Sequence, residues 1–364
     1  MKRELFEKFF PLPDFLRRPA LGVDVSDESV KFVGLEEKNG RLKVKVIGGK
    51  TIPAGAILAG RIIDRQVVVK VLSAIKKETG YRFVYASLPE NEAYVVRLKL
   101  PPMKKSEIYS SIELQLDQHV PIPPEECAFG YEPLVCLTAK ETRFENEVAV
   151  SVLPRQTADE YLAVFEEAGF FPLAFELEAQ AIARALKGSS LGETEMIVDI
   201  GKLHTSFSIA QKGRVVFTSI IDMGGFHFTR ALERTLKIET AEAEKIKTKK
   251  GLMRSSANQE IFNALIMVTS VLKDEVKRRL NYWLEHKSDL ARAPVSEVKI
   301  CGGQSTLPGL REYLESHLGL PVELGEPWQG VSFDRGELPP VIFNDAMRYA
   351  TAIGLAERAY ERDE

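Results

Sequence analysis

The stretch LGVDVSDESVKFVGLEEKNGRLKV, residues 21–44, decides how this chain is read. A short apolar run ends at Asp24, crosses polar residues, resumes at Val30 and reaches a turn that closes at Gly40. Glycine supplies the positive φ that a tight hairpin turn requires. An acid at the tip of a strand, beside such a turn, can hold a metal–phosphate group, but the same pattern also begins ordinary hairpins. The stretch alone leaves both interpretations open.

A second copy of the pattern lies in the other half of the chain. Residues 196–219, MIVDIGKLHTSFSIAQKGRVVFTS, again run from a strand to an acid, Asp199, and on to a glycine turn at Gly213. Two acid-tipped meanders about 175 residues apart predict duplicated halves that face each other across a cleft. A coincidence between two generic hairpins is the alternative.

Composition narrows the class of protein. The chain has 364 residues, of which 45% are hydrophobic and 28% are charged, and this length predicts two or three globular domains. A net charge of −3 argues against a nucleic-acid binder, which would carry a strongly basic face. No stretch approaches 18 consecutive apolar residues, so we expect no membrane span.

The N-terminal segment and the cysteines indicate the compartment. The segment lacks the apolar core and cleavage site of a secretory signal. Three cysteines are too few and too widely spaced for a disulfide scaffold, so we expect a cytosolic protein: Cys127, Cys136 and Cys301. The same segment contains a short apolar helical face, open to docking on the protein itself, a partner or a membrane: Leu5, Phe6, Phe9 and Phe10.

The region between the two copies has a different sequence pattern, which predicts an inserted α+β subdomain over residues 93–170. We expect a proline-flanked helix over 104–119, strands near 128–136 and 147–153, and a helix capped by Thr157 and ended by Gly169. A helix of small residues over 175–188 then suits close packing between the halves.

Two glycine pairs stand where strands pass into helices. Gly224-Gly225 and Gly302-Gly303 leave backbone N–H groups open at the positive end of a helix dipole, where phosphate or a sugar edge can approach. Asp24 would hold Mg²⁺ together with Asp199, through water as this ion prefers. Between the pairs, a helical pattern over 258–286 carries a core stripe at three- and four-residue steps.

The ordered set of these motifs resembles the actin-like ATPases, and most of all the PilM family of type IV pilus assembly, with FtsA as the related family. The phrases that carry the likeness are IVDIGKLHTSFSIA, AEAEKIK, GGQSTLPGLREYL and YATAIGLAER. The likeness covers about residues 20–358. It implies a two-lobed α/β fold of duplicated RNase H-like cores, ATP with Mg²⁺ in the cleft, and an inserted subdomain of the FtsA and PilM type.

The resemblance assigns ranges to these parts. It implies an N-terminal arm (1–20), a first-lobe core (21–92 and 171–190), the insertion (93–170), a second lobe (191–350, helical over about 228–292) and a C-terminal helix returning to the first lobe (345–362). The implied phosphate-binding residues are Asp24, Ser26, Asp27, Lys31, Gly201, Lys202, Thr205, Gly224 and Gly225. Those implied for adenosine are Glu244, Lys247, Gly302 and Gly303.

The sequence leaves a second interpretation open for several of these residues. Glu178 falls near the place where an actin-like ATPase orients the attacking water, but it also fits a helix-surface carboxylate. Glu244 and Lys247 equally fit a solvated helix face with weak ion pairs. The first loop departs from the family pattern, because Ser26 replaces a glycine and Asp27 replaces a small hydroxyl residue. A carboxylate beside a polyphosphate is repulsive unless a cation lies between them, so this chain binds ATP weakly, needs Mg²⁺ strictly or has lost the nucleotide.

The implied function is a cytoplasmic scaffold, peripheral to the inner membrane, that docks the cytoplasmic tail of a PilN-like membrane protein and works beside pilus-assembly ATPases. Any ATP hydrolysis is expected to be slow and regulatory. A groove for the tail has five candidate lining residues, for which core packing is the alternative: Tyr94, Leu98, Ile108, Ile112 and Leu116. The competing functions are an FtsA-like filament former and a small-molecule kinase of the same superfamily, which would need a carboxylate base beside a substrate pocket.

Overall fold

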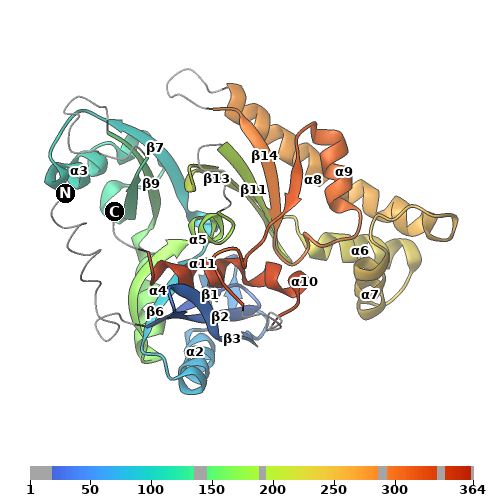
Figure 1. The fold of residues 1–364 in the computed structure, drawn as a ribbon, viewed down its shortest axis with the longest axis horizontal. Helices are drawn as coiled ribbons and strands as arrows, with labels where there is room; N and C mark the ends of the chain where they lie inside the picture. Colours follow the sequence, from blue (N-terminus) through green and yellow to red (C-terminus); the bar gives the residue numbers. More distant parts are fainter. Residues whose placement is uncertain (1–18, 135–145, 188–193, 286–292, 334–340, 362–364) are drawn as a thin grey trace.

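The computed structural model describes residues 19–134, 146–187, 194–285, 293–333 and 341–361. The apolar N-terminal face around Phe6 and Phe9, and Cys136, lie outside these ranges. Figure 1 shows one five-stranded sheet at the bottom, a second at the upper right and a smaller sheet at the upper left. Within the described residues, no helix combines the length and the apolar character needed to cross a bilayer.

The first large sheet is built on the opening stretch of the sequence. Its strand order is β10 (Phe171–Leu177), β6 (Phe83–Leu88), β1 (Ala20–Val25), β2 (Ser29–Lys38) and β3 (Arg41–Thr51). Strand β1 runs antiparallel to β2 and parallel to β6. Asn39 and Gly40 take φ values of 55° and 73° in the β2–β3 turn, as the hairpin interpretation requires.

The second large sheet repeats this arrangement. Its order is β15 (Val322–Leu324), β14 (Val295–Cys301), β11 (Thr194–Ile200), β12 (Thr205–Gln211) and β13 (Arg214–Ile221). Strand β11 runs antiparallel to β12 and parallel to β14, just as β1 does with β2 and β6. The two acid-tipped meanders therefore occupy equivalent places in two sheets of the same topology.

Helices cover both sheets. In the first lobe, α2 (Arg65–Thr79) and α4 (Arg155–Glu167) pack on one face, while α5 (Glu178–Ala185) and α11 (Ala350–Arg358) pack on the other. In the second lobe the cover consists of α6 (Gly225–Leu236), α7 (Thr240–Lys250), α8 (Gln259–Glu285) and α9 (Leu310–Leu318). The predicted stripe of α8 is in the core, with Leu265 and Val276 fully buried.

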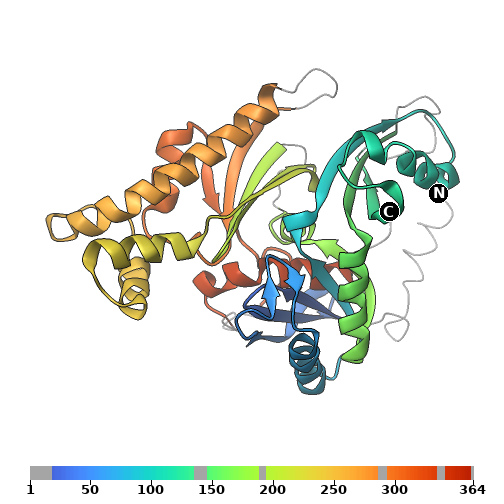
Figure 2. The ribbon, with the colours of Figure 1, turned by 180° about the vertical axis from the view of Figure 1, so that it is seen from behind.

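Helices α5 and α11 lie between the two sheets, as the two opposite views in Figures 1 and 2 show. Ala183 and Ile182 of α5 pack with Ile197 and Val215 of the second sheet. Ala185 of the same helix packs with α11 and with β2 of the first sheet. The short helix α10 (Phe343–Ala346) leads the chain into α11. These small-residue helices place the tips of both acid meanders on one interlobe cavity.

The smaller sheet has its own core and touches the second lobe. Its strand order is β7 (Tyr94–Leu100), β9 (Asn146–Pro154) and β8 (Cys127–Pro133), with α3 (Lys105–Glu113) packed against it. A two-stranded pair, β4 (Ile57–Leu58) and β5 (Arg61–Ile62), belongs to the first lobe. Strand β7 contacts β13, and the Arg97 Nη1 atom donates a hydrogen bond of 2.9 Å to Gln211 Oε1.

The structure corrects three local predictions. The helix over 104–119 ends as an α-helix at Glu113 and continues only as a 3-10 turn over 116–118. The helix over 175–188 begins at Glu178, because residues 175–177 pair with β6 as part of β10. Thr157 is not an N-cap: α4 begins two residues earlier, directly after Pro154, and the Thr157 hydroxyl donates to Glu92 Oε2 at 3.1 Å.

Candidate functional site

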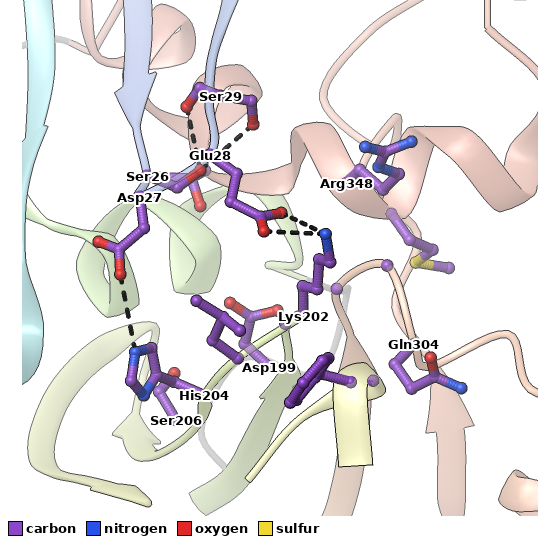
Figure 3. Close-up of a pocket in the computed structure, with 18 of the residues that line it drawn as sticks. Ser26, Asp27, Glu28, Ser29, Asp199, Lys202, His204, Ser206, Gln304 and Arg348 are labelled. Carbon is purple, nitrogen blue, oxygen red and sulfur yellow. Dashed lines mark hydrogen bonds and ion pairs between the residues drawn. The ribbon is translucent and has the colours of Figure 1, made fainter. Parts of the chain in front are cut away.

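A cavity of about 740 Å³ lies between the lobes, within the size range of small-molecule sites. It is lined by the β1–β2 and β11–β12 tips, the N-termini of α5 and α6, part of α7, and the loops after β14 and before α11. Figure 3 shows a close-up of these walls. The cavity brings together the predicted residues Asp24, Ser26, Asp27, Lys31, Glu178, Asp199, Gly201, Lys202, Gly225, Glu244, Lys247, Gly302 and Gly303. The predicted Thr205 and Gly224 are buried and are not among its lining residues.

Asp24 is a buried acid held by specific partners. Its Oδ2 atom lies 3.0 Å from Lys31 Nζ, and its Oδ1 atom accepts a hydrogen bond of 3.2 Å from Ser87 Oγ. The same Ser87 hydroxyl accepts from the Val25 backbone N–H, so the acid is fixed to both neighbouring strands. Burial disfavours the Lys31 ammonium, but the charge and hydrogen bond of Asp24 outweigh it and raise the pKa of Lys31.

Three further carboxylates line the same cavity as Asp24. Burial and, after it, the charge of Asp24 raise the pKa of Asp199 to about 6. Burial and the charges of Asp24, Glu90 and Asp199 raise the pKa of Glu178 well above its usual range. So concentrated an acidic site fits a cation or a Mg²⁺-bound phosphate better than a bare anion. Among the described residues no group of three His, Cys, Asp or Glu is arranged to hold a metal directly.

The third of these carboxylates, Glu90, is buried and accepts a hydrogen bond from the Ala179 N–H at the start of α5. Burial raises its pKa to about 7 from an ordinary 4.5. Between these pH values the folded protein keeps a proton that the unfolded chain has lost, so the contribution of Glu90 to stability falls as pH rises from about 4.5 to 7.

We expect Glu90→Gln to remove this loss, because glutamine keeps an acceptor for Ala179 and carries no charge. At pH 8 the variant should exceed the wild-type free energy of unfolding by about 3 kcal/mol, and near pH 4.5 the two should agree. Urea unfolding at a series of pH values measures this difference. If the free energy of unfolding depends on pH in the same way for both proteins, Glu90 ionises in the folded state with an ordinary pKa.

Asp27 has backbone partners in the first lobe. Its carboxylate accepts hydrogen bonds of 2.9 Å from the backbone N–H groups of Ala59 and Gly60, in the turn between β4 and β5. Ser26 is also occupied locally, because its hydroxyl donates to the Ser29 carbonyl at 3.0 Å. The expected repulsion between Asp27 and a phosphate is therefore reduced by two fixed backbone dipoles.

Contacts between the two lobes cross the cavity, and local sequence patterns could not predict them. Glu28, on the first lobe, pairs with Lys202 of the second at 2.7 Å (Figure 3). His204 Nε2 lies 4.0 Å from Asp27 Oδ2, and its Nδ1 atom lies 3.1 Å from Asp222. Glu28 and His204 were not among the predicted site residues, and only the fold brings them into contact with Lys202 and Asp27, some 175 positions away in the sequence.

The first glycine pair has a different local role from the one predicted. The Gly225 N–H donates to the Gly201 carbonyl, and the Phe226 N–H donates to the Lys202 carbonyl, so these amides at the start of α6 are already used. A Cβ on Gly224 would lie 2.6 Å from the Lys202 carbonyl oxygen. These glycines let α6 begin tightly against the second hairpin, which corrects the expectation that their amides stand open to phosphate.

The second pair and α7 complete the far wall. Gly302 has φ of 85°, and a Cβ there would lie 2.2 Å from Asp199 Oδ1, so this position requires glycine. The Lys247 ammonium donates to Glu244, Thr229 and the Gly225 carbonyl at 2.8–3.1 Å. Burial lowers the pKa of Lys247. A solvated helix face is therefore wrong for Lys247, which ties α7 to the start of α6.

The predicted partner groove divides into one surface residue and a core. Tyr94 is exposed. The others are fully buried in the core between α3 and the small sheet, which is the packing role that the sequence had left open: Leu98, Ile108, Ile112 and Leu116. They support the subdomain and do not present a surface to a partner in this conformation.

Solved structures and curated relatives agree with this architecture. The structure of a PilM–PilN type IV pilus biogenesis complex matches with a TM-score of 0.81 and 21% identity, covering 95% of this chain and 100% of that one. MreB5 of Spiroplasma citri bound to AMPPNP matches with a TM-score of 0.54 and 14% identity, over 93% of this chain and 94% of that one. These likenesses confirm the actin-like ATPase fold.

Sequence relatives are more distant. The cell division protein FtsA of Streptococcus pneumoniae serotype 2 is 22% identical over 348 residues, which is 85% of this chain and 75% of that protein. FtsA of Neisseria meningitidis serogroup B is 27% identical over 45% of this chain and 42% of its own length. The family model described as type IV pilus assembly protein PilM matches residues 22–360. The chain therefore belongs to the PilM family of type IV pilus assembly proteins.

Proposed function

We propose that this protein is a nucleotide-binding scaffold of type IV pilus assembly, with ATP·Mg²⁺ in the interlobe cavity. The observation that carries the proposal is the convergence of two acid-tipped meanders and the Gly302 turn on one cavity, in a chain that the PilM model matches over residues 22–360. Asp24 and Asp199 would hold the ion through its water ligands, and Lys31 and Lys202 supply positive charge at the phosphate end. The ion neutralises phosphate charge beside the carboxylates.

The partner and the location belong to the same proposal. A PilM–PilN complex is the structure that shares this fold with a TM-score of 0.81. We therefore assign this chain a PilN-like partner whose cytoplasmic tail it binds, which would hold it on the cytoplasmic side of the inner membrane. The domain ranges predicted from the sequence are part of this proposal, with the insertion over 93–170 as the partner-binding part.

Nucleotide turnover is expected to be slow. A base that activates water must be able to accept a proton at neutral pH. Burial and the neighbouring acids raise the pKa of Glu178, which favours its protonated form and weakens it as a base. Lys31 and a bound Mg²⁺ would both favour the ionised form, so Glu178 is the candidate for orienting water. In the scaffold role, bound nucleotide favours one arrangement of the two lobes, and this arrangement changes how the scaffold binds its partner.

Thermal melting tests the proposal in one design. We expect millimolar ATP·Mg²⁺ to raise the melting temperature of the protein, because a ligand that binds only the folded state stabilises it by mass action. A synthetic peptide of the cytoplasmic tail from a PilN-like protein should raise it independently. ATP with excess chelator is the control for the metal.

The two arms of this experiment separate the parts of the proposal. No shift with ATP·Mg²⁺ at millimolar concentration would mean that the cavity has lost its nucleotide. No shift with the tail peptide, alone or with ATP·Mg²⁺, would contradict the scaffold role. Rapid transfer of phosphate from ATP to a metabolite would favour the kinase instead.

A further inference from the structure

The phosphate end of the cavity already contains an anion of the protein. The two Glu28 carboxylate oxygens lie 2.7 and 2.8 Å from Lys202 Nζ. Lys202 belongs to the hairpin tip that follows Asp199, and Glu28 belongs to the tip that follows Asp24. The pair thus joins the two phosphate-loop candidates directly, across the opening between the lobes (Figure 3).

Neighbouring contacts place Glu28 there. Asp27, one residue earlier, is fixed by the Ala59 and Gly60 amides, and Ser26 is fixed by Ser29. The Ile52 N–H donates to the Glu28 carbonyl at 2.8 Å, which holds the backbone on the other side. With its backbone held, the Glu28 side chain extends over the cavity toward the second lobe.

We propose that Glu28 is an internal competitor for the phosphate end of the cleft. Its carboxylate engages Lys202 when no nucleotide is bound, joins the lobes, and must release Lys202 when a nucleotide phosphate arrives. This inference rests on the proposed nucleotide binding, and it makes Glu28 a determinant of nucleotide affinity in this chain.

The exposure of the Glu28–Lys202 pair favours competition with a nucleotide phosphate over a permanent link between the lobes. Glu28 and Lys202 keep 43% and 60% of their side-chain surface exposed. An exposed pair of this kind is easily broken, so an arriving phosphate can displace it. The released carboxylate still stands close to the bound phosphates and repels them, which lowers affinity further. Both effects disappear when Glu28 loses its charge.

The test compares Glu28→Gln with a matched control. Glu78→Gln removes another exposed acid of the first lobe, whose pair with Lys50 at 2.5 Å does not cross the cleft. Isothermal titration with ADP·Mg²⁺ and ATP·Mg²⁺ should show about fivefold tighter binding for Glu28→Gln than for the wild type. Glu78→Gln should bind as the wild type does. Equal affinity in all three proteins would overturn the proposal.

A nucleotide-free measurement tests the joining of the lobes separately. By hydrogen–deuterium exchange, Glu28→Gln should exchange the amides of residues 199–206 several-fold faster than the wild type. The charge-swapped variant Glu28→Lys/Lys202→Glu should restore slow exchange, because the pair is re-formed with reversed polarity. Unchanged exchange in Glu28→Gln would refute the joining of the lobes by this pair.

The two measurements also separate this inference from the proposed function. If no variant binds nucleotide, nucleotide binding by the cavity fails and competition fails with it, while the exchange data still decide whether the pair joins the lobes. If the wild type and Glu28→Gln bind nucleotide equally, nucleotide binding stands and Glu28 is not a competitor.

Discussion

Asp24→Ala is expected to destabilise the protein by about 3–5 kcal/mol, which is the usual cost of removing one partner from a buried ion pair. Asp24 is 4% exposed, and its carboxylate is the hydrogen-bonded partner of the Lys31 ammonium. Without it, Lys31 keeps its charge inside the protein, where Glu178 still favours the ammonium and the like charge of Arg348 disfavours it. The Ser87 hydroxyl also loses its acceptor.

A double substitution shows whether the stranded charge causes the loss. Lys31→Met removes the ammonium, so Asp24→Ala/Lys31→Met should be more stable than Asp24→Ala alone, although it has lost more polar contacts. Urea unfolding followed by circular dichroism measures the three variants. If Asp24→Ala and the double variant unfold at the same urea concentration, the cost lies in the hydrogen bonds of Asp24 and not in the charge of Lys31.

The parts of the fold that could be predicted are those encoded locally. The β2–β3 and β12–β13 turns follow from Asn39-Gly40 and Gly213, residue types that favour the positive φ values they adopt. The core stripe of α8 follows from its periodicity. The duplication follows from comparing two such local signals, and the two sheets indeed share one topology.

The parts that could not be predicted depend on contacts between distant residues. The Asp27 carboxylate accepts hydrogen bonds from the turn of the β4–β5 hairpin, whose two-residue strands are too short to leave a periodic signal. The strand β10 pairs residues 175–177 with β6, overriding a sequence that reads as a continuous helix. The sequence placed Lys202 at the phosphate, but its ion pair with Glu28 exists only because the lobes meet.

Gly354→Ala is the second large effect that we expect, a loss of about 3 kcal/mol or more in the free energy of unfolding. Helix α11 crosses α5 so closely that a Cβ on Gly354 would lie 1.8 Å from the Ala181 carbonyl oxygen. The obstacle is backbone, so no side-chain rotation relieves it, and the two helices must separate. Since α5 and α11 lie between both sheets, the separation disturbs the packing of each lobe.

The helix propensities of glycine and alanine predict the opposite sign for Gly354→Ala, so the test separates propensity from the steric effect. Alanine favours a helix over glycine by about 1 kcal/mol, so propensity alone predicts that Gly354→Ala stabilises the protein. Gly130→Ala in β8 is the control, because an added Cβ there meets no atom within 4 Å. Urea unfolding should show a large loss for Gly354→Ala and little change for Gly130→Ala. Ala181→Gly should not rescue Gly354→Ala, because it leaves the obstructing carbonyl in place; a rescue would mean that side-chain crowding, and not the backbone approach, sets the distance between these helices.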